Sequence, residues 1–217
     1  MHPNDYPRNL PDKHIEDEMQ QFEAAWILGE LEPGSRVLDL GYGSGIIARA
    51  LVAAGHRVTV VDGAPFEVEG ATCVVSMFEN FEPDTKYDAV IASFILEHVD
   101  DPVALLKRAR QWTEKLIVVC GNAASIHRRL AVKMGLQPSL FTLSARDIAV
   151  GHHRVYDIVE LMSELGDAGW TVRKTKGLFM KPLPNSMMTG YSVALLRAMN
   201  EIELPVEFMA NVGMVCE

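Results

Sequence analysis

The stretch RVLDLGYGSGIIARAL, residues 36–51, joins two hydrophobic patterns through a turn that contains three glycines. Its first five residues are an apolar run typical of a buried strand, and residues 45–55 have the apolar spacing of a helix. Gly41, Gly43 and Gly45 lie at the junction, where glycine lets the backbone approach a ligand closely. The stretch therefore predicts a strand, a ligand-binding turn and a helix, in that order.

The composition of the chain indicates a single α/β domain. It has 217 residues, of which 48% are hydrophobic, and 29 acidic residues outnumber 20 basic ones, for a formal net charge of -9. An acidic chain of this kind argues against nucleic acid as a general partner. We also see no apolar signal segment and no apolar run long enough to span a membrane, so we expect no membrane partner and a cytoplasmic location.

Strand and helix patterns alternate along the chain. The expected strands cover residues 36–40, 57–63, 72–77, 87–94, 115–121, 170–182 (a strand and then a loop) and 208–217. The expected helices cover residues 14–30, 45–55, 102–113, 123–134, 157–169 and 187–202, with Asp100 or Asp101 as the cap of the third. Because the strands are apolar on both faces, the pattern predicts a mostly parallel sheet with helices on both faces, in one domain over residues 1–217.

The glycine spacing does not fit a pyrophosphate. In the dinucleotide fingerprint G-x-G-x-x-G/A the third position would fall on Ile46, and the lysine of a P-loop is absent. Asp39, two residues before the first glycine, would repel a phosphate but suits a cation such as an amino group. Asp62 ends the next strand, where an acid can bind both hydroxyls of a ribose. S-adenosylmethionine has an ammonium and a ribose and no phosphate, so it is the predicted ligand.

Three segments resemble the class I S-adenosylmethionine-dependent methyltransferases, the broad group that includes the ubiquinone and menaquinone biosynthesis enzymes. They are VLDLGYGSG at 37–45, VTVVDGA at 58–64 and YDAVIASFILEHVDDP at 87–102, and the resemblance covers residues 15–121. It implies a Rossmann-like α/β fold with seven strands, mostly parallel, of which the last is antiparallel. It also implies a helical segment at 1–30 over the substrate side and acceptor-site loops and helices at 122–190.

The resemblance further implies a set of cofactor contacts. Residues after the third strand, Ser76 to Phe81, would frame the adenine, and the end of the fourth strand would line the cofactor. The expected set is Asp39, Gly41, Tyr42, Gly43, Gly45, Asp62, Gly63, Met77, Phe78, Ser93, Phe94 and His98. Two alternatives stay open at this point, because Asp39 could merely cap the following helix and Asp62 could merely form a turn.

No metal site is predicted. The three cysteines, Cys73, Cys120 and Cys216, have no metal-like spacing and lie in apolar contexts, which indicates buried free thiols. A related group of quinone methyltransferases uses a Glu-His pair after the fourth strand, with an acidic residue three positions before it, as a metal site. Here the pair is Glu97-His98 and the earlier position holds Phe94, so the third ligand is missing.

The segment GHHRVYD, residues 151–157, is a dense group of proton-transfer side chains after the fifth strand. Histidine titrates near neutral pH and can remove a proton from an acceptor hydroxyl or amine. The candidates for this catalytic role are, in order, His152, His153, His127 and His98, with Tyr156 as a further candidate. The alternative is a polar loop in which Asp157 caps the next helix.

Together these features predict a methyltransferase that acts on a small molecule and releases S-adenosylhomocysteine. The expected reaction is O- or N-methylation of a natural product, a sugar or an anionic metabolite, while C- or S-methylation stays open. The arginines and histidines of the second half favour an anionic or polyhydroxylated acceptor. Two other functions stay open: an NAD-type nucleotide binder and a non-catalytic relative of the fold. We expect a monomer or a homodimer.

Overall fold

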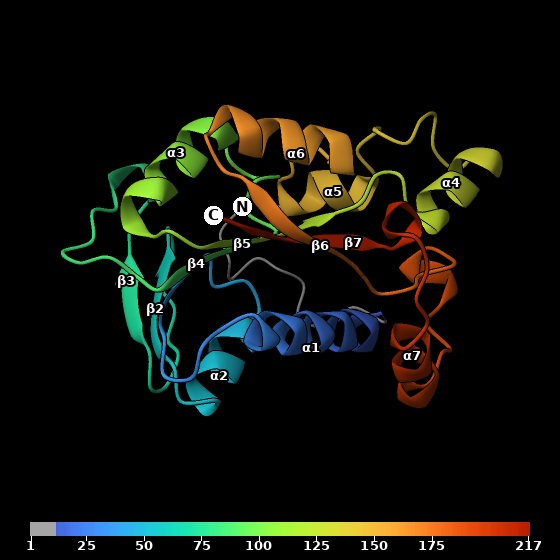
Figure 1. The fold of residues 1–217 in the computed structure, drawn as a ribbon. Coiled ribbons are helices and arrows are strands. Elements are labelled where there is room, and N and C mark those ends of the chain that lie inside the picture. The colour runs from blue at the N-terminus through green and yellow to red at the C-terminus, as the bar shows by residue number, and fades with distance from the viewer. Residues whose placement is uncertain (1–11) are drawn as a thin grey trace.

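The computed structural model describes residues 12–217 and forms one seven-stranded sheet in the order β3-β2-β1-β4-β5-β7-β6 (Figure 1). Its strands are β1 Arg36–Leu40, β2 Arg57–Asp62, β3 Thr72–Val75, β4 Ala89–Ser93, β5 Leu116–Gly121, β6 Val172–Leu178 and β7 Asn211–Cys216. Strands β1 to β5 pair in parallel, whereas β7 runs antiparallel to both β5 and β6. The predicted sheet with a reversed last strand is therefore confirmed.

Helices cover both faces of the sheet (Figure 1). They are α1 Lys13–Gly29, α2 Ile46–Ala53, α3 Pro102–Trp112, α4 Ile126–Lys133, α5 Ala145–Val150, α6 Ile158–Asp167 and α7 Val193–Asn200. One core cluster joins α1 and α2 to the sheet face that carries Val37 and Ile91. The other joins α3 and α6 to the opposite face, which carries Leu38 and Leu40. This alternation along β1 decides which face each side chain of the site can reach.

Local capping explains where the helices begin. Of the two aspartates expected before α3, Asp101 is the cap, and its carboxylate accepts a hydrogen bond of 2.9 Å from the Ala104 N–H. Asp157 caps α6 in the same way through the Glu160 N–H, at 2.9 Å. Gly169, at a φ of +83°, follows the end of α6, as the sequence predicts.

Two parts of the second half differ from the prediction. The helix expected over 187–202 begins only at Val193, because the Ser192 hydroxyl caps it there and the preceding residues form a separate short turn. Helix α5 is not predicted at all. Its signal is a capping box, in which Ser144 and Asp147 each accept a hydrogen bond from the other's backbone N–H.

Several bulk expectations can be compared with the structure over the described part of the chain. All three cysteines are free thiols, with Cys120 and Cys216 buried and Cys73 partly buried. No helix within residues 12–217 is long and apolar enough to cross a membrane. The first eleven residues of the N-terminal segment expected over the substrate side lie outside the described residues.

Candidate active site

The glycine turn leaves β1 at its carboxyl end with backbone conformations that favour glycine. Gly41, Gly43 and Gly45 have φ angles of +85°, +51° and +72°, all in the left-handed region. A Cβ atom on Gly41 would also collide with the Ile95 side chain. Conformation therefore favours glycine at all three positions, and at Gly41 a side chain would also require Ile95 to move.

Asp39 lies on the face of β1 that α1 and α2 cover, and it is only 3% exposed. Burial raises the pKa of its carboxyl well above the usual range, and the side chain has no hydrogen bond or ion pair with the described residues. The alternative role as a helix cap is wrong, because Gly45 is the N-cap residue of α2 and no side chain caps this helix. A buried carboxyl without a partner next to the turn fits an incoming cation, since the cation would favour its ionised form.

Asp62 ends β2 and faces the same turn. Its Oδ2 accepts a hydrogen bond of 2.8 Å from the Tyr42 N–H, and its Oδ1 accepts one of 2.9 Å from the Ala64 N–H. The turn-forming role is thus present. It does not use up the carboxylate, because each oxygen keeps a lone pair for a further donor such as a ribose hydroxyl.

The residues expected at the adenine lie next to Asp62. A Cβ atom on Gly63 would lie 2.9 Å from the Met77 Sδ, so the two segments are in close contact. Met77 is largely exposed, whereas Phe78 is partly buried against the core on the α3 side. The Tyr42 ring stacks on Phe66 with a centroid distance of 5.1 Å. Apolar side chains that follow β1, β2 and β3 thus lie near the strand ends around Asp62.

The carboxyl end of β4 holds a strained residue. Phe94 has a φ of +53°, although it is not a glycine, and its N–H donates to the Val119 carbonyl at 2.8 Å. Its ring lies about 3.9 Å from where a Cβ atom on Gly121 would stand. Ser93, just before it, is partly buried. Within residues 12–217 no group of acids, histidines or cysteines is arranged to hold a metal ion.

Two of the candidate histidines form one unit with a carboxylate. The rings of His98 and His152 meet edge to face at 4.6 Å, and the His152 Nδ1 lies 3.3 Å from the Asp147 Oδ1. Burial, together with the neighbouring His152, lowers the pKa of His98 to about 4. Although burial opposes its ionisation, hydrogen bonds from His152 and Ser144 hold the pKa of Asp147 below its usual value. His98 is therefore a neutral base at pH 7, with an oriented partner behind it.

The other two histidines have different surroundings. His153 is exposed, and its Nδ1 lies 3.0 Å from the carboxylate of Asp100, which is almost fully exposed. His127, on α4, is partly buried. Burial and then the positive charge of Lys181 lower its pKa well below the usual value, and its Nδ1 has no hydrogen-bond partner among the described residues.

Tyr156 lies in the core, contrary to the role of a base expected for it. It is 2% exposed, and its hydroxyl donates to the Glu164 Oε2 at 2.7 Å. Burial, followed by that hydrogen bond, raises its pKa. Its neighbour Arg154 donates to the carbonyls of Val99, at 2.8 Å, and Asp100, at 3.1 Å. Both side chains stabilise the loop after β4 instead of facing an acceptor.

Two buried carboxyl groups and a partly buried lysine are missing from the predicted set. Glu23 and Glu97 are almost completely buried, and burial raises the pKa of both carboxyls. Lys181 follows β6, and burial together with the cation of Arg146 lowers its pKa to about 8. Glu23 could have been found as an acid at helical spacing to the apolar face of α1, four residues before Ile27. The other two carry no local signal.

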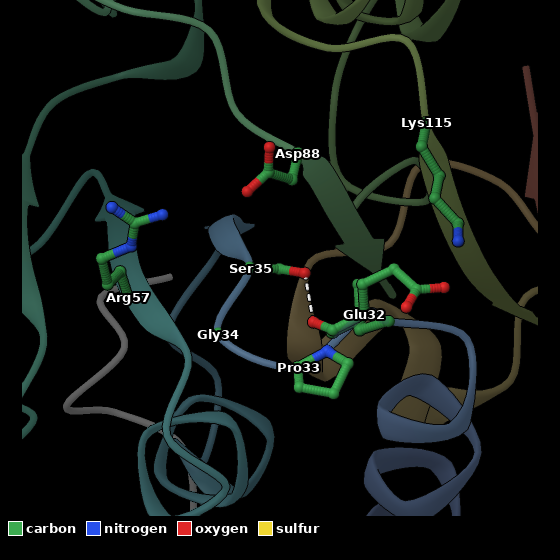
Figure 2. Close-up of a pocket in the computed structure, with 8 residues that line it drawn as sticks. Glu32, Pro33, Gly34, Ser35, Arg57, Asp88 and Lys115 are labelled. Carbon is green, nitrogen blue, oxygen red and sulfur yellow. Dashed lines mark hydrogen bonds between the residues drawn. The ribbon is translucent and has the colours of Figure 1, made fainter.

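A hollow of about 370 Å³ lies at the opposite, amino edge of the sheet (Figure 2). Arg57, Asp88 and Lys115 line it together with the loop around Glu32. The Asp88 Oδ2 accepts a hydrogen bond of 2.6 Å from the Arg36 N–H, so this carboxylate already has a partner. Ligands of open parallel sheets bind at the carboxyl ends of the strands, and we therefore assign no cofactor role to this hollow.

Comparison with known proteins identifies the family. A family model described as a methyltransferase domain matches residues 12–175, more than half of the chain. The chain belongs to the class I S-adenosylmethionine-dependent methyltransferases. The ubiquinone biosynthesis O-methyltransferase of Xanthomonas campestris pv. campestris is 35% identical to it over 177 residues, which are 70% of each protein. That of Xanthomonas axonopodis pv. citri is 26% identical over 186 residues, 74% of this chain and 73% of the relative.

Solved methyltransferases share the fold at low sequence identity. The magnesium protoporphyrin IX methyltransferase of Synechocystis with bound S-adenosylhomocysteine has a TM-score of 0.61 and 18% identity, over 98% of this chain and 89% of the other. The 1,6-didemethyltoxoflavin-N1-methyltransferase of Burkholderia thailandensis has a TM-score of 0.58 and 15% identity, over 98% and 92%. The cofactor of this methyltransferase is therefore S-adenosylmethionine, and the alternative of an NAD-type binder is set aside.

Proposed function

We propose that this methyltransferase transfers a methyl group to an oxygen or nitrogen atom of a small molecule, with His98 as the proton acceptor. The observation that supports the proposal best is the row of His98, His152 and Asp147 beside the carboxyl end of β4. Such a row supplies a neutral imidazole, a second ring that packs against it and a carboxylate that orients the second ring. This assignment places His98 first, whereas the order expected from the sequence places His152 and His153 ahead of it.

The chain's residues would divide the work of the reaction. S-adenosylmethionine supplies an activated methyl group on a sulfonium. Asp39 would bind the cofactor's amino group, and Asp62 the ribose hydroxyls. His98 would take the proton from the acceptor's O–H or N–H group. The electron pair of that bond then forms the bond to the methyl carbon, while the pair of the broken carbon–sulfur bond stays on sulfur. Because the leaving group is charged, alignment and proton removal are the main tasks that fall to the protein.

Lys181 supports an acceptor that carries a negative charge away from the reacting atom. It has no hydrogen bond or ion pair with the described residues, and its charge acts on the His127 ring. A partly buried ammonium without a partner favours an anionic ligand, which would restore its usual pKa. The names of the relatives and solved structures include quinone, porphyrin and toxoflavin chemistry, so they support a small-molecule acceptor without selecting one.

Two measurements test the proposal. Calorimetry should detect binding of S-adenosylhomocysteine, and mass spectrometry should detect methylated products when the protein is incubated with S-adenosylmethionine and a panel of phenols, amines, sugars and their anionic derivatives. Cofactor binding without any product across the panel would favour the non-catalytic alternative. Products methylated on carbon or sulfur would contradict the proposed reaction class.

A further inference from the structure

Helix α1 packs on one face of the sheet, and two neighbouring side chains of the helix contact residues at the carboxyl edge. The Gln20 side chain accepts a hydrogen bond from the Ser44 hydroxyl in the glycine turn. Three residues later, the Glu23 Oε1 accepts one of 2.6 Å from the Asn211 Nδ2 at the start of β7. Residues three apart share one face of a helix. Glu23 therefore lies between the cofactor turn and the β5–β7 edge, which is where an acceptor must meet the cofactor.

Glu23 keeps one carboxyl oxygen without a partner in a buried position. The residue is 1% exposed, and Asn211, which holds its Oε1, is 4% exposed. The Glu23 Oε2 is buried and has no hydrogen-bond partner among the described residues. A buried polar atom of this kind destabilises the folded state unless a ligand or a water molecule satisfies it.

Glu97 is a second carboxyl group that contacts the carboxyl edge of the β5–β7 pair. Its Oε1 accepts a hydrogen bond of 3.0 Å from the Gly121 N–H, and Gly121 is the β5 residue paired with Asn211 of β7. Among the described residues its Oε2 is also buried without a geometric hydrogen-bond partner, although the nearby Cys120 thiol helps to offset the effect of burial on the pKa of this carboxyl. The two carboxyl groups thus flank one pair of residues at the edge of the sheet, and each has one oxygen left for a donor.

The electrostatics of the pair agree with this geometry. Burial raises the pKa of Glu23 to about 8, the hydrogen bond from Asn211 opposes the rise, and the like charge of Glu97 adds to it. A ligand that brings a hydrogen-bond donor would relieve both carboxyls. A ligand that brings a carboxylate supplies no hydrogen-bond donor to either unpaired oxygen and places its own charge in a buried site, which increases the cost.

We propose that Glu23, held by Asn211 and facing the same strand pair as Glu97, binds the proton-bearing oxygen or nitrogen of the methyl acceptor and selects against carboxylate acceptors. The inference rests on the proposed function and narrows it, because it excludes methyl esters as products. Glu23 holds the acceptor by one hydrogen bond, and His98 removes the reacting proton. A primary amine offers a separate N–H to each side chain, whereas a phenol has one O–H and needs a neighbouring hydroxyl to reach both. An anionic group elsewhere on the acceptor remains compatible, because Lys181 follows β6 on a separate segment.

The test uses three matched classes of probe, which are phenols, arylalkyl amines and aryl carboxylic acids, each with S-adenosylmethionine and the full chain. We expect methyl ethers or N-methyl amines from the wild type. The class of probe that reacts shows whether oxygen or nitrogen is methylated. We expect Glu23→Gln to lower turnover roughly 10- to 100-fold by weakening one hydrogen bond at a buried carboxyl, and to leave the affinity for S-adenosylhomocysteine unchanged. Glu18→Gln is the matched control, since Glu18 is a buried acid on the same helix that pairs with Arg197.

Several outcomes would overturn the inference. Methyl esters as the main products would do so, and so would normal turnover in Glu23→Gln, or an equal loss in Glu18→Gln.

If no class yields product, the inference is tested by binding of the probes to the complex with S-adenosylhomocysteine. A preference for the amine or phenol that Glu23→Gln removes supports the inference, whereas a preference for the carboxylic acid, or no binding of any class, contradicts it. Failure to bind S-adenosylhomocysteine would instead count against the proposed function. Thermal unfolding of Glu23→Gln checks that the variant is folded.

Discussion

Contacts around the glycine turn join residues that are close in sequence, whereas those around the acceptor side join distant ones. Asp62 holds Tyr42, 20 residues away, and Ala64, two residues away. On the acceptor side, Arg146 pairs with Asp12 across 134 residues, and Asn211 holds Glu23 across 188. The cofactor half is therefore made of contiguous motifs. The proposed acceptor site is formed by single side chains that the fold brings together from distant segments, so these residues need no common sequence pattern.

Removal of the proposed base should separate catalysis from cofactor binding most clearly. We expect His98→Ala to lower turnover by about 10²–10⁴-fold, the usual contribution of a general base, without weakening the binding of S-adenosylhomocysteine. Because the pKa of His98 lies at about 4, the imidazole stays neutral at higher pH, and turnover should fall only as the pH drops toward that value. His153→Ala is the control, since His153 pairs with a surface carboxylate and should be silent. Equal losses in both variants would contradict the assignment.

Asp39→Asn should separate binding from stability within the cofactor half. We expect affinity for S-adenosylhomocysteine to fall by about 1.5–3 kcal/mol, because a charged hydrogen bond to the amino group becomes a neutral one. Stability should change in the opposite direction. Burial raises the folded pKa of this carboxyl above its unfolded value, so the folded protein becomes less stable as the pH rises through the folded pKa. The neutral amide avoids this loss and should raise the unfolding temperature at pH 7. Calorimetry and thermal unfolding measure the two effects, and a parallel loss in both would contradict this account.

A smaller effect should distinguish the two ends of the sheet. We expect Asp62→Ala to weaken cofactor binding by ~1–3 kcal/mol through the loss of ribose hydrogen bonds. Asp88→Ala at the amino edge is a matched control, because Asp88 also accepts a backbone N–H at a strand end. Titration with S-adenosylhomocysteine should show a change only in Asp62→Ala. If both variants bind normally, Asp62 acts only in the turn.

The smallest effect is expected from Tyr156→Phe. It removes one hydrogen bond to Glu164 inside the core, which costs about 1 kcal/mol of the free energy of unfolding, and leaves turnover unchanged. Denaturant unfolding and a turnover assay check the two parts. A large loss of turnover with normal stability would restore Tyr156 as a catalytic candidate.

Much of the fold and of the cofactor edge is readable in the sequence because its determinants are local. Apolar runs predict the strands, Asp101 and Asp157 mark helix starts, and the spacing of Asp39 and three glycines predicts the cofactor. Alternating side chains along a strand also place Asp39 on a definite face of the sheet. Each of these depends on backbone conformation or on residues within one strand-turn-helix unit. Such a unit can be recognised from the sequence without knowledge of the rest of the structure.

Only the tertiary structure decided the surroundings of the polar side chains that are proposed to meet the acceptor. The motif GHHRVYD appears uniform in the sequence, yet His152 packs on His98, His153 faces a surface carboxylate and Tyr156 enters the core. Glu23 gains its partner from the last strand of the chain. The physical reason is that burial and long-range pairing set the charge and direction of a polar group, and both depend on chain segments far from it in the sequence.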